Sequence, residues 1–275
     1  MSPVRPFVVA LLVTRVRRRW RRRLASLIGR GAPNEIDLLV ALSEVLNLTG
    51  TVVDVGARFG TAAVPFARAG HEVLAFEPDP ANQDVLRHVT RWLPSIRVDP
   101  RAVSDESRSG VHLFVSPGKS SLSSLVPFDE SHRRGGTVDI VTLREALEEH
   151  QVSDLDVLKV DAEGNDLKVL RGFDWERVTR PKLVMCEFDG RKVPAGGHTY
   201  EEVTDLLANL GYRMLISEWH PVLEYGTSDH RWRCVEWFPH ALHGPLSHGN
   251  IIGIDPSYAE DSVTSVIRAW RASMS

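Results

Sequence analysis

Cysteine is scarce in this chain. Of its 275 residues only Cys186 and Cys234 are cysteine, which excludes a disulfide framework and a zinc site with four cysteine ligands. So few cysteines fit a reducing compartment, and we expect a cytoplasmic protein. The composition, with 43% hydrophobic and 25% charged residues, is that of a globular protein. The chain is long enough to form a hydrophobic core without disulfide or metal cross-links.

Long hydrophobic runs are also absent near the start of the chain. The longest clean apolar run there covers residues 7–13, whereas crossing a bilayer takes about 20 residues. Seven arginines follow this run, between Arg15 and Arg23, and no small-residue cleavage site is evident. Because a secretory signal carries its charges before the apolar stretch, we expect neither a signal peptide nor a transmembrane helix.

Acidic residues are absent from residues 1–31, which hold nine arginines. The total net charge of −3 therefore leaves −12 on the rest of the chain, and an acidic body disfavours nucleic acid, so we expect no nucleic-acid partner. We interpret residues 1–33 as a solvated basic extension. The alternatives are contact of residues 1–31 with nucleic acid or another acidic partner, or with an anionic membrane surface, which would make the protein membrane-peripheral.

The rest of the chain alternates between two kinds of hydrophobic pattern. Expected strands cover residues 51–55, 72–76, 96–98, 111–115, 137–141, 156–160, 182–188, 212–216 and 250–254. Expected helices cover residues 35–48, 61–69, 82–92, 143–150, 165–170, 200–210 and 263–270. This alternation predicts the α/β class with a doubly wound, mainly parallel, Rossmann-like sheet. We expect one domain at residues 34–255 and a C-terminal helix within 256–275.

The loop after the first expected strand has the features of a ligand-binding turn. Gly56 and Gly60 allow a tight turn and close approach of a ligand, and the next helix offers free N–H groups. The dinucleotide fingerprint G-x-G-x-x-G is not matched, because Ala57 follows Gly56 and the middle glycine is missing. An NAD(P)-dependent Rossmann enzyme is therefore kept only as an alternative.

Two acids flank this loop. Glu77 ends the second expected strand, where a carboxylate suits two ribose hydroxyls, and Asp54 lies where it could receive an ammonium group. An acid for a ribose and an acid for an amine, without a phosphate cradle, describe S-adenosylmethionine better than a dinucleotide. The alternative is a purely structural role, in which both acids only cap helices.

Several runs resemble the FkbM-type family of S-adenosylmethionine-dependent methyltransferases. They read V-D-V-G-A-R-F-G-T at 53–61, A-F-E-P at 75–78, A-V-S-D at 102–105 and K-V-D-A-E-G at 159–164. The resemblance covers about residues 50–215. It implies a class I methyltransferase fold and transfer of a methyl group to oxygen, on a small-molecule or glycan acceptor such as a sugar or secondary metabolite. Asn165 and Asp166 depart from the family's usual small residue followed by Glu.

The expected cofactor contacts combine the glycine loop, the acids and the segment after residue 101. They are Asp54, Gly56, Ala57, Gly60, Glu77, Pro78, Ala102, Val103, Ser104 and Asp161. The hydroxyl-rich loop at 116–124 is interpreted as a surface loop or as a cover for the cofactor or acceptor. Within it, Ser121 and Leu122 match a serine–leucine pair of the family.

The candidate catalytic residues are Asp161 and Glu163, which follow the strand expected at 156–160. Asp161 is the first candidate for the base that helps to remove the acceptor's proton. We expect the turn at Gly164 to rotate Glu163 away, and Lys159 to pair with one of the two carboxylates. The alternative is that Asp161 and Glu163 only cap the next helix.

Residue types that bind metals occur in two sets, but neither spacing fixes a ligand geometry. The first set is Asp161, Glu187 and Asp189, which suits magnesium or calcium. The second set is His240, His243 and His248, near a lone cysteine and interrupted by prolines. We therefore expect no metal. The tryptophans and histidines of residues 218–249 are interpreted as an acceptor pocket or as the packing of a late antiparallel hairpin.

The cofactor half of such a sequence does not encode the acceptor atom, so N- and C-methylation also stay open. A non-catalytic alternative is a methyltransferase-like scaffold that docks to a membrane or a partner through its arginine-rich arm.

Overall fold

The computed structural model describes residues 34–117, 122–176, 180–221, 231–258 and 260–274. The basic extension expected at residues 1–33 lies outside them. The helices are α2 (Glu35–Val45), α3 (Ala63–Ala69), α4 (Pro80–Thr90), α5 (Leu143–Glu149), α6 (Asp166–Arg171), α7 (Lys192–Ala195), α8 (Tyr200–Asn209) and α9 (Glu260–Met274). The strands are β1 (Thr51–Val55), β2 (Val73–Phe76), β3 (Ile96–Asp99), β4 (Ala102–Ser104), β5 (Arg108–Val115), β6 (Arg133–Thr142), β7 (Leu155–Val160), β8 (Leu183–Asp189), β9 (Arg213–Trp219), β10 (Trp232–Trp237) and β11 (His248–Ile254).

An eight-stranded sheet, in the order β10-β9-β11-β8-β7-β1-β2-β3, forms the centre of the described part of the chain. Pairing is parallel from β3 through β2, β1 and β7 to β8, whereas β11 runs antiparallel to both β8 and β9, and β10 runs antiparallel to β9. The chain moves from β1 outward to β3 and later returns to β7 on the other side of β1. The point between β1 and β7 is therefore the topological switch, and the expected doubly wound, mainly parallel α/β sheet is confirmed.

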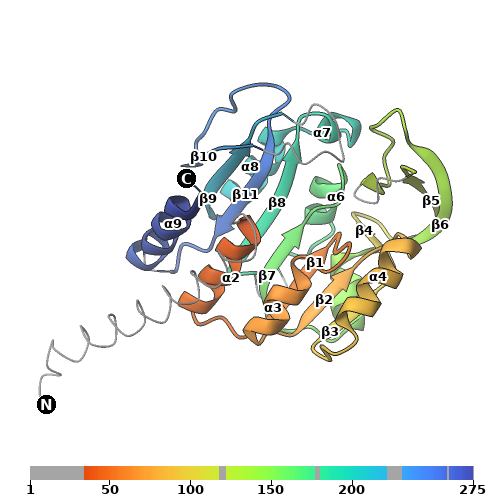
Figure 1. Ribbon diagram of the computed structural model, residues 1–275, viewed down its shortest axis with the longest axis horizontal. Coiled ribbons are helices and arrows are strands. Elements are labelled where there is room, and N and C mark those ends of the chain that lie inside the picture. The colour runs from red at the N-terminus through yellow and green to blue at the C-terminus, as the bar shows by residue number, and fades with distance from the viewer. Residues whose placement is uncertain (1–33, 118–121, 177–179, 222–230, 259, 275) are drawn as a thin grey trace, which may run out of the picture.

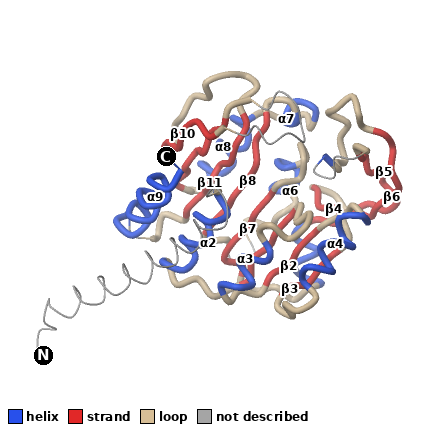
Figure 2. Tube along the Cα trace, in the orientation of Figure 1, coloured by secondary structure: helices blue, strands red, loops and turns tan. Residues whose placement is uncertain are grey.

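Helices cover both faces of this sheet (Figure 1, Figure 2). One face packs against α2, α3, α4 and α9 in a core that contains Phe66 and Trp270. The other face packs against α5, α6 and α8 in a core that contains Leu207. Neighbouring strand residues supply opposite cores, as Val52 and Val53 do, because side chains alternate along a strand.

The C-terminal helix α9 lies beside α2 at one end of the sheet (Figure 1). Trp270 of α9 is 2% exposed, and its indole N–H donates to the carbonyl of Asn34 at 2.9 Å. Residues 260–274 therefore contribute to the core. Within the ranges that the structure describes, no helix has both the length and the apolar character that a membrane crossing requires.

A second, three-stranded sheet in the order β4-β6-β5 lies at the opposite end of the molecule from α9 (Figure 1). β5 and β6 are antiparallel, and β4 joins β6 in parallel. Ser124 forms an antiparallel bridge with Phe114 of β5. This bridge holds the segment at 122–125 against the small sheet.

The sequence predicted every strand and helix named above except β4, α7 and β10. β4 and α7 have only three and four residues, too few for a periodic pattern. β10 lies at the sheet edge, where its partner among the described strands is β9, and Val235 is its one buried residue, so it has no continuous hydrophobic pattern.

Candidate active site

A pocket opens where β1, β2 and β7 end, beside the topological switch point, which is where open α/β sheets bind ligands. Six of the predicted cofactor contacts line it: Gly56, Glu77, Pro78, Ala102, Val103 and Asp161. The two predicted catalytic residues, Asp161 and Glu163, both lie in its wall. The structure thus brings together the ends of the motifs that are far apart in the sequence.

The glycine loop is shaped by the protein's own backbone. Gly56 has a φ of +74°, and a Cβ added there would lie 1.9 Å from the carbonyl oxygen of Asp161. Gly60 has a φ of +84° and abuts the side chain of Leu86. We expected both glycines to admit a ligand. The structure instead requires glycine because β1 and β7 approach each other closely and because the loop is left-handed.

Glu77 ties the loop to the second strand. One of its carboxylate oxygens accepts the backbone N–H of Arg58 at 2.7 Å, and the other accepts the N–H of Asp79 at 2.9 Å and the side-chain amide of Asn82 at 3.3 Å. Burial raises the pKa of Glu77, while these hydrogen bonds act in the opposite direction. A carboxylate has about four acceptor positions, so Glu77 keeps capacity for a ligand hydroxyl.

Asp54 does not line the pocket, which corrects its expected role as the receiver of an ammonium group. Its side chain is fully buried, and its Oδ1 lies 3.0 Å from Nζ of Lys159. The Lys159 ammonium also donates to the carbonyls of Val55 and Gly56 and lies 3.5 Å from Oδ2 of Asp161. The expected structural pairing of Lys159 is therefore confirmed, and the ammonium that Asp54 binds belongs to the protein.

Three other predicted cofactor contacts also lie outside the pocket lining. Ala57 is 1% exposed and packs in the core, and Gly60 packs against α4. The Ser104 hydroxyl is buried and donates to Asp105 at 3.0 Å. Each belongs to a motif that borders the pocket, but its side chain or backbone is used for packing.

The turn after β7 holds Glu163 beside Asp161. Glu163 has a φ of +51° and Gly164 a φ of +92°, so two consecutive residues are left-handed. Asp166 stabilises this turn because its carboxylate accepts the N–H groups of Ala162 at 2.7 Å and Gly164 at 3.0 Å. The expectation that the turn rotates Glu163 away is wrong, since left-handed backbone keeps its carboxylate on the side of Asp161.

The two residues that depart from the family pattern both have structural partners. Asp166 caps the turn as described, and the Asn165 amide donates to the carbonyl of Val103 at 2.9 Å. Asn165 thereby joins the start of α6 to β4 in the pocket wall.

Three carboxylates gather at the ends of β7 and β8. Oxygens of Asp161, Glu163 and Glu187 all lie within 4.8 Å of one another. The Lys192 ammonium, from α7, lies 2.8 Å from Glu163 and 2.9 Å from Glu187. The positive charge of Lys192 thus partly offsets the repulsion between these carboxylates. Asp189, which we had grouped with Asp161 and Glu187, instead accepts the N–H of Arg191 at 2.8 Å.

Burial and charge give these carboxylates different proton affinities. Burial raises the pKa of Glu163 to about 7 despite Lys192, with Asp161 adding to the rise. Burial and the Asp161 charge raise the pKa of Glu187 well above its ordinary value. For Asp161, burial is outweighed by Lys159 and Lys192, which lower its pKa. At neutral pH the cluster therefore combines an ionised Asp161 with a Glu163 near its midpoint, and Glu187 holds its proton more tightly than an ordinary glutamate does.

The hydroxyl-rich loop closes one side of the pocket. Ser123, Ser124 and Leu125 line it, and the Ser121 of the expected family pair lies outside the described residues. The Ser124 hydroxyl donates to the carbonyl of Glu163 at 2.7 Å, and the Ser123 hydroxyl donates to Asp79 at 2.5 Å. The loop therefore bridges the β2 and β7 sides of the pocket, as expected of a cover.

Other residues of the site were not among the predicted contacts. Arg58, Asn82 and Arg101 line the pocket, and Lys192 completes the carboxylate cluster. Asn82 lies five residues after Glu77, at the start of the next helix, so its proximity could have been inferred. The position of Lys192 depends on the packing of α7 against the turn at Gly164, which no local pattern encodes.

Residues 54–214 match the family model described as the methyltransferase FkbM domain. No curated protein matches the chain.

Solved structures with some similarity include three methyltransferases. A putative O-methyltransferase from Klebsiella pneumoniae is 12% identical with a TM-score of 0.45, covering 93% of this chain and 92% of that chain. Precorrin-6y C5,15-methyltransferase from Geobacter metallireducens GS-15 is 12% identical with a TM-score of 0.40, over 79% and 87%. A putative RNA methyltransferase from Pyrococcus horikoshii is 13% identical with a TM-score of 0.40, over 80% and 84%.

The family model spans more than half of the chain, and its first matched residue, Asp54, lies in the strand that leads into the pocket. The chain belongs to the methyltransferases with an FkbM domain.

Proposed function

We propose that the protein transfers a methyl group from S-adenosylmethionine to a hydroxyl of a small molecule or glycan, such as a sugar or secondary metabolite. The observation that carries the proposal is the pocket between Glu77 at the end of β2 and the Asp161–Glu163 pair at the end of β7. One end suits the hydroxyls of a nucleoside, and the other end carries the carboxylates that a cation and a proton transfer require.

The chemistry of the pocket wall fits this cofactor. Glu77 offers acceptor capacity for a ribose hydroxyl, and Phe76, Val103 and Leu113 offer apolar surface for a purine ring. The ionised Asp161 favours a positively charged sulfonium or ammonium group by Coulomb attraction. When bound, S-adenosylmethionine supplies an electrophilic methyl group.

Glu163 is the residue best suited to receive the acceptor's proton. A base is most effective when its pKa lies near the working pH, and the pKa of Glu163 is about 7. Asp161 was the first candidate from the sequence, but its lowered pKa makes it a weaker base. We assign Asp161 to hold the cationic end of the cofactor and Glu163 to take the proton at its carboxylate. Lys192, 2.8 Å away, orients that carboxylate.

A transfer assay tests the proposal. The full chain is incubated with radiolabelled S-adenosylmethionine and fractionated small-molecule extracts, and labelled products are identified by mass spectrometry. We expect an O-methylated product, and Glu163→Gln should lower kcat by about 10²–10⁴-fold. Glu148→Gln, an exposed change on α5, serves as the matched control and should not alter the rate.

The pH profile separates a base from a merely structural carboxylate. The transfer rate should rise with pH through about 7 in the wild type and lose this rise in Glu163→Gln. Products labelled on nitrogen or carbon would contradict the proposed acceptor atom. A protein that binds the donor but labels no fraction would support the scaffold alternative.

A further inference from the structure

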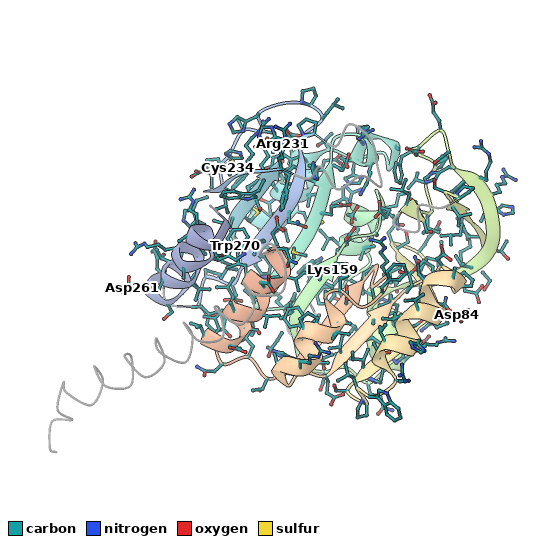
Figure 3. All side chains as sticks on the ribbon, in the orientation of Figure 1. Asp84, Lys159, Arg231, Cys234, Asp261 and Trp270 are labelled. Atoms are coloured by element: carbon teal, nitrogen blue, oxygen red, sulfur yellow. The ribbon has the colours of Figure 1, made fainter. Side chains whose placement is uncertain are left out.

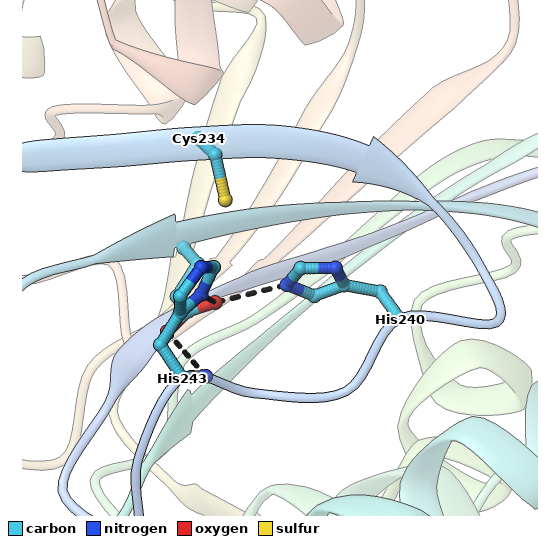
Figure 4. Close-up of side chains that lie close together, drawn as sticks. Cys234, His240 and His243 are labelled. Atoms are coloured by element: carbon cyan, nitrogen blue, oxygen red, sulfur yellow. Dashed lines mark hydrogen bonds and ion pairs between the residues drawn. The ribbon is translucent and has the colours of Figure 1, made fainter.

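A second cluster of metal-ligand side chains lies well away from the pocket, near the edge of the sheet. It consists of Glu218 of β9, Cys234 of β10, and His240 and His243 of the loop between β10 and β11. Figure 4 shows Cys234, His240 and His243 pointing toward a common centre, and Figure 3 shows Cys234 far from Lys159, which lies beneath the pocket. Neither the family match nor the proposed reaction uses this cluster.

The four side chains converge closely. Their Oε, Sγ and ring nitrogen atoms all lie within 4.8 Å of one another. Nε2 of His240 is 2.9 Å and Nδ1 of His243 is 2.8 Å from the same carboxylate oxygen, Oε2 of Glu218. Within the described ranges, the Cys234 thiol has no hydrogen-bond partner, so hydrogen bonding accounts for the histidines but leaves the cysteine unexplained.

We propose that Glu218, Cys234, His240 and His243 bind a zinc ion. One thiolate, two imidazoles and one carboxylate are the donor types that zinc takes, and four of them complete its tetrahedral shell. With zinc–ligand bonds of about 2.0–2.3 Å, tetrahedral ligand atoms lie ~3.3–3.8 Å apart. Entry of the ion would thus widen the His–Glu separations by about 0.5 Å and draw the sulfur inward.

Neighbouring side chains and a backbone N–H hold the Glu218 carboxylate in one orientation. Its other oxygen, Oε1, accepts the Ser247 hydroxyl at 2.6 Å and the His243 N–H at 3.1 Å and lies 3.3 Å from Arg233. Such supporting hydrogen bonds leave Oε2 oriented toward the centre of the cluster.

The cluster is open to solvent on one side, and its four ligands would fill the coordination shell of the ion. The His243 side chain is 51% exposed, whereas Glu218 is fully buried, so the ion can enter from solvent beside His243. All four coordination positions are filled by protein, which is the arrangement of a structural zinc site. The ion would tie β9 and β10 to the loop that carries Ser247, whose carbonyl accepts the N–H of Gly190 after β8.

This proposal replaces part of the sequence expectation. We expected no metal and considered His240 and His243 only together with His248. The structure places the His248 ring 6.3 Å from that of Trp219, outside the cluster, and brings in Glu218 and Cys234 from separate strands. Those two ligands could not be recognised from spacing along the chain.

Metal titration of the full chain tests the proposal. Protein dialysed against a chelator is titrated with zinc in competition with a chromophoric chelator, and separately with Co(II), whose spectrum reports thiolate ligation. We expect one tightly bound zinc per chain and a thiolate-to-cobalt charge-transfer band. Cys234→Ser should abolish that band while Cys186, buried in β8, remains as an internal control.

Ligand variants decide between a metal site and a hydrogen-bond network. His243→Gln changes an exposed side chain and should fold normally, yet weaken zinc binding by about 100-fold or more, since even supporting partners of zinc ligands cost about 10–100-fold. His112→Gln, an exposed histidine on β5, should leave binding unchanged. The proposal is overturned if the wild type binds no zinc, or if Cys234→Ser and His243→Gln bind it as tightly as the wild type.

Discussion

The ammonium of Lys159 lies 3.0 Å from the carboxylate of Asp54, and both side chains are almost completely buried. Asp54 belongs to β1 and Lys159 to β7, and these strands are paired on either side of the topological switch point. The same ammonium donates to the carbonyls of Val55 and Gly56, where the glycine loop begins. Lys159 therefore holds the end of β1 and the start of the glycine loop against β7, next to the pocket.

Replacing Lys159 by methionine should destabilise the protein strongly. Lys159→Met keeps the apolar stem but leaves Asp54 as an unpaired buried charge, and breaking such a pair costs about 3–5 kcal/mol of unfolding free energy. Lys168→Met, a partly exposed change on α6, should cost about 0.5 kcal/mol or less. Urea unfolding measures both, and equal stability of the two variants would show that the ion pair is not structural.

The glycine loop offers a second stability test with an internal control. Gly56 and Gly70 are both left-handed, with φ of +74° and +104°, but a Cβ has no neighbour within 4 Å at Gly70 and meets the Asp161 carbonyl at Gly56. Gly70→Ala should therefore cost only the backbone strain, about 1–2 kcal/mol.

Gly56→Ala should cost at least about 2 kcal/mol more, because β1 and β7 must separate to admit the methyl group. Thermal and urea unfolding of the two variants give the difference. Similar losses in both would mean that the close approach of the two strands does not constrain residue 56.

The fold could be predicted because its central strands are buried on both faces. All six residues of the strand at 155–160 are buried, and the apolar residues at 155, 157, 158 and 160 make it recognisable in the sequence. Edge strand β10 has one fully buried residue, Val235, and left no such pattern. The glycines and Glu77 were recognisable for a different reason, because they lie in the turn after one strand and at the end of the next strand, both of which the local sequence predicts.

The rest of the site depends on which strands become neighbours. Asp54 looked available for a ligand because its partner, Lys159, lies more than a hundred residues later and pairs with it only across the sheet. Lys192 reaches Glu163 and Glu187 from a one-turn helix that no periodicity marks. In both cases the deciding contact is between charged groups that are distant in sequence.

The raised pKa of Glu163 predicts how stability depends on pH. The folded carboxyl keeps its proton to about pH 7, whereas in the unfolded chain it releases the proton near its ordinary value of 4.5. The folded state therefore binds more protons in this window, and its stability falls as pH rises from 5 to 8.

Glu163→Gln cannot titrate and should lose this contribution to the pH dependence. The unfolding free energy of the wild type relative to the variant should therefore decrease between pH 5 and pH 8 in urea titrations. A difference that stays constant, as expected for the exposed control Glu148→Gln, would show that Glu163 titrates normally in the folded protein.

Glu77 and Glu72 stand at opposite ends of β2 and form a matched pair for binding. Glu77→Ala removes the carboxylate in the pocket and should weaken S-adenosylmethionine binding by about 1–3 kcal/mol, as expected for loss of hydrogen bonds to a ligand. Glu72→Ala, which alters an exposed side chain, should leave affinity unchanged. Equal affinities of the two variants in calorimetry would exclude Glu77 as a cofactor contact.

The measurement closest to the central claim is a calorimetric titration of the wild-type chain with S-adenosylmethionine, alongside NAD and NADP. We predict one S-adenosylmethionine bound per chain and no heat of binding from either dinucleotide. An absence of S-adenosylmethionine binding, or preferential binding of a dinucleotide, would contradict the assignment of this pocket.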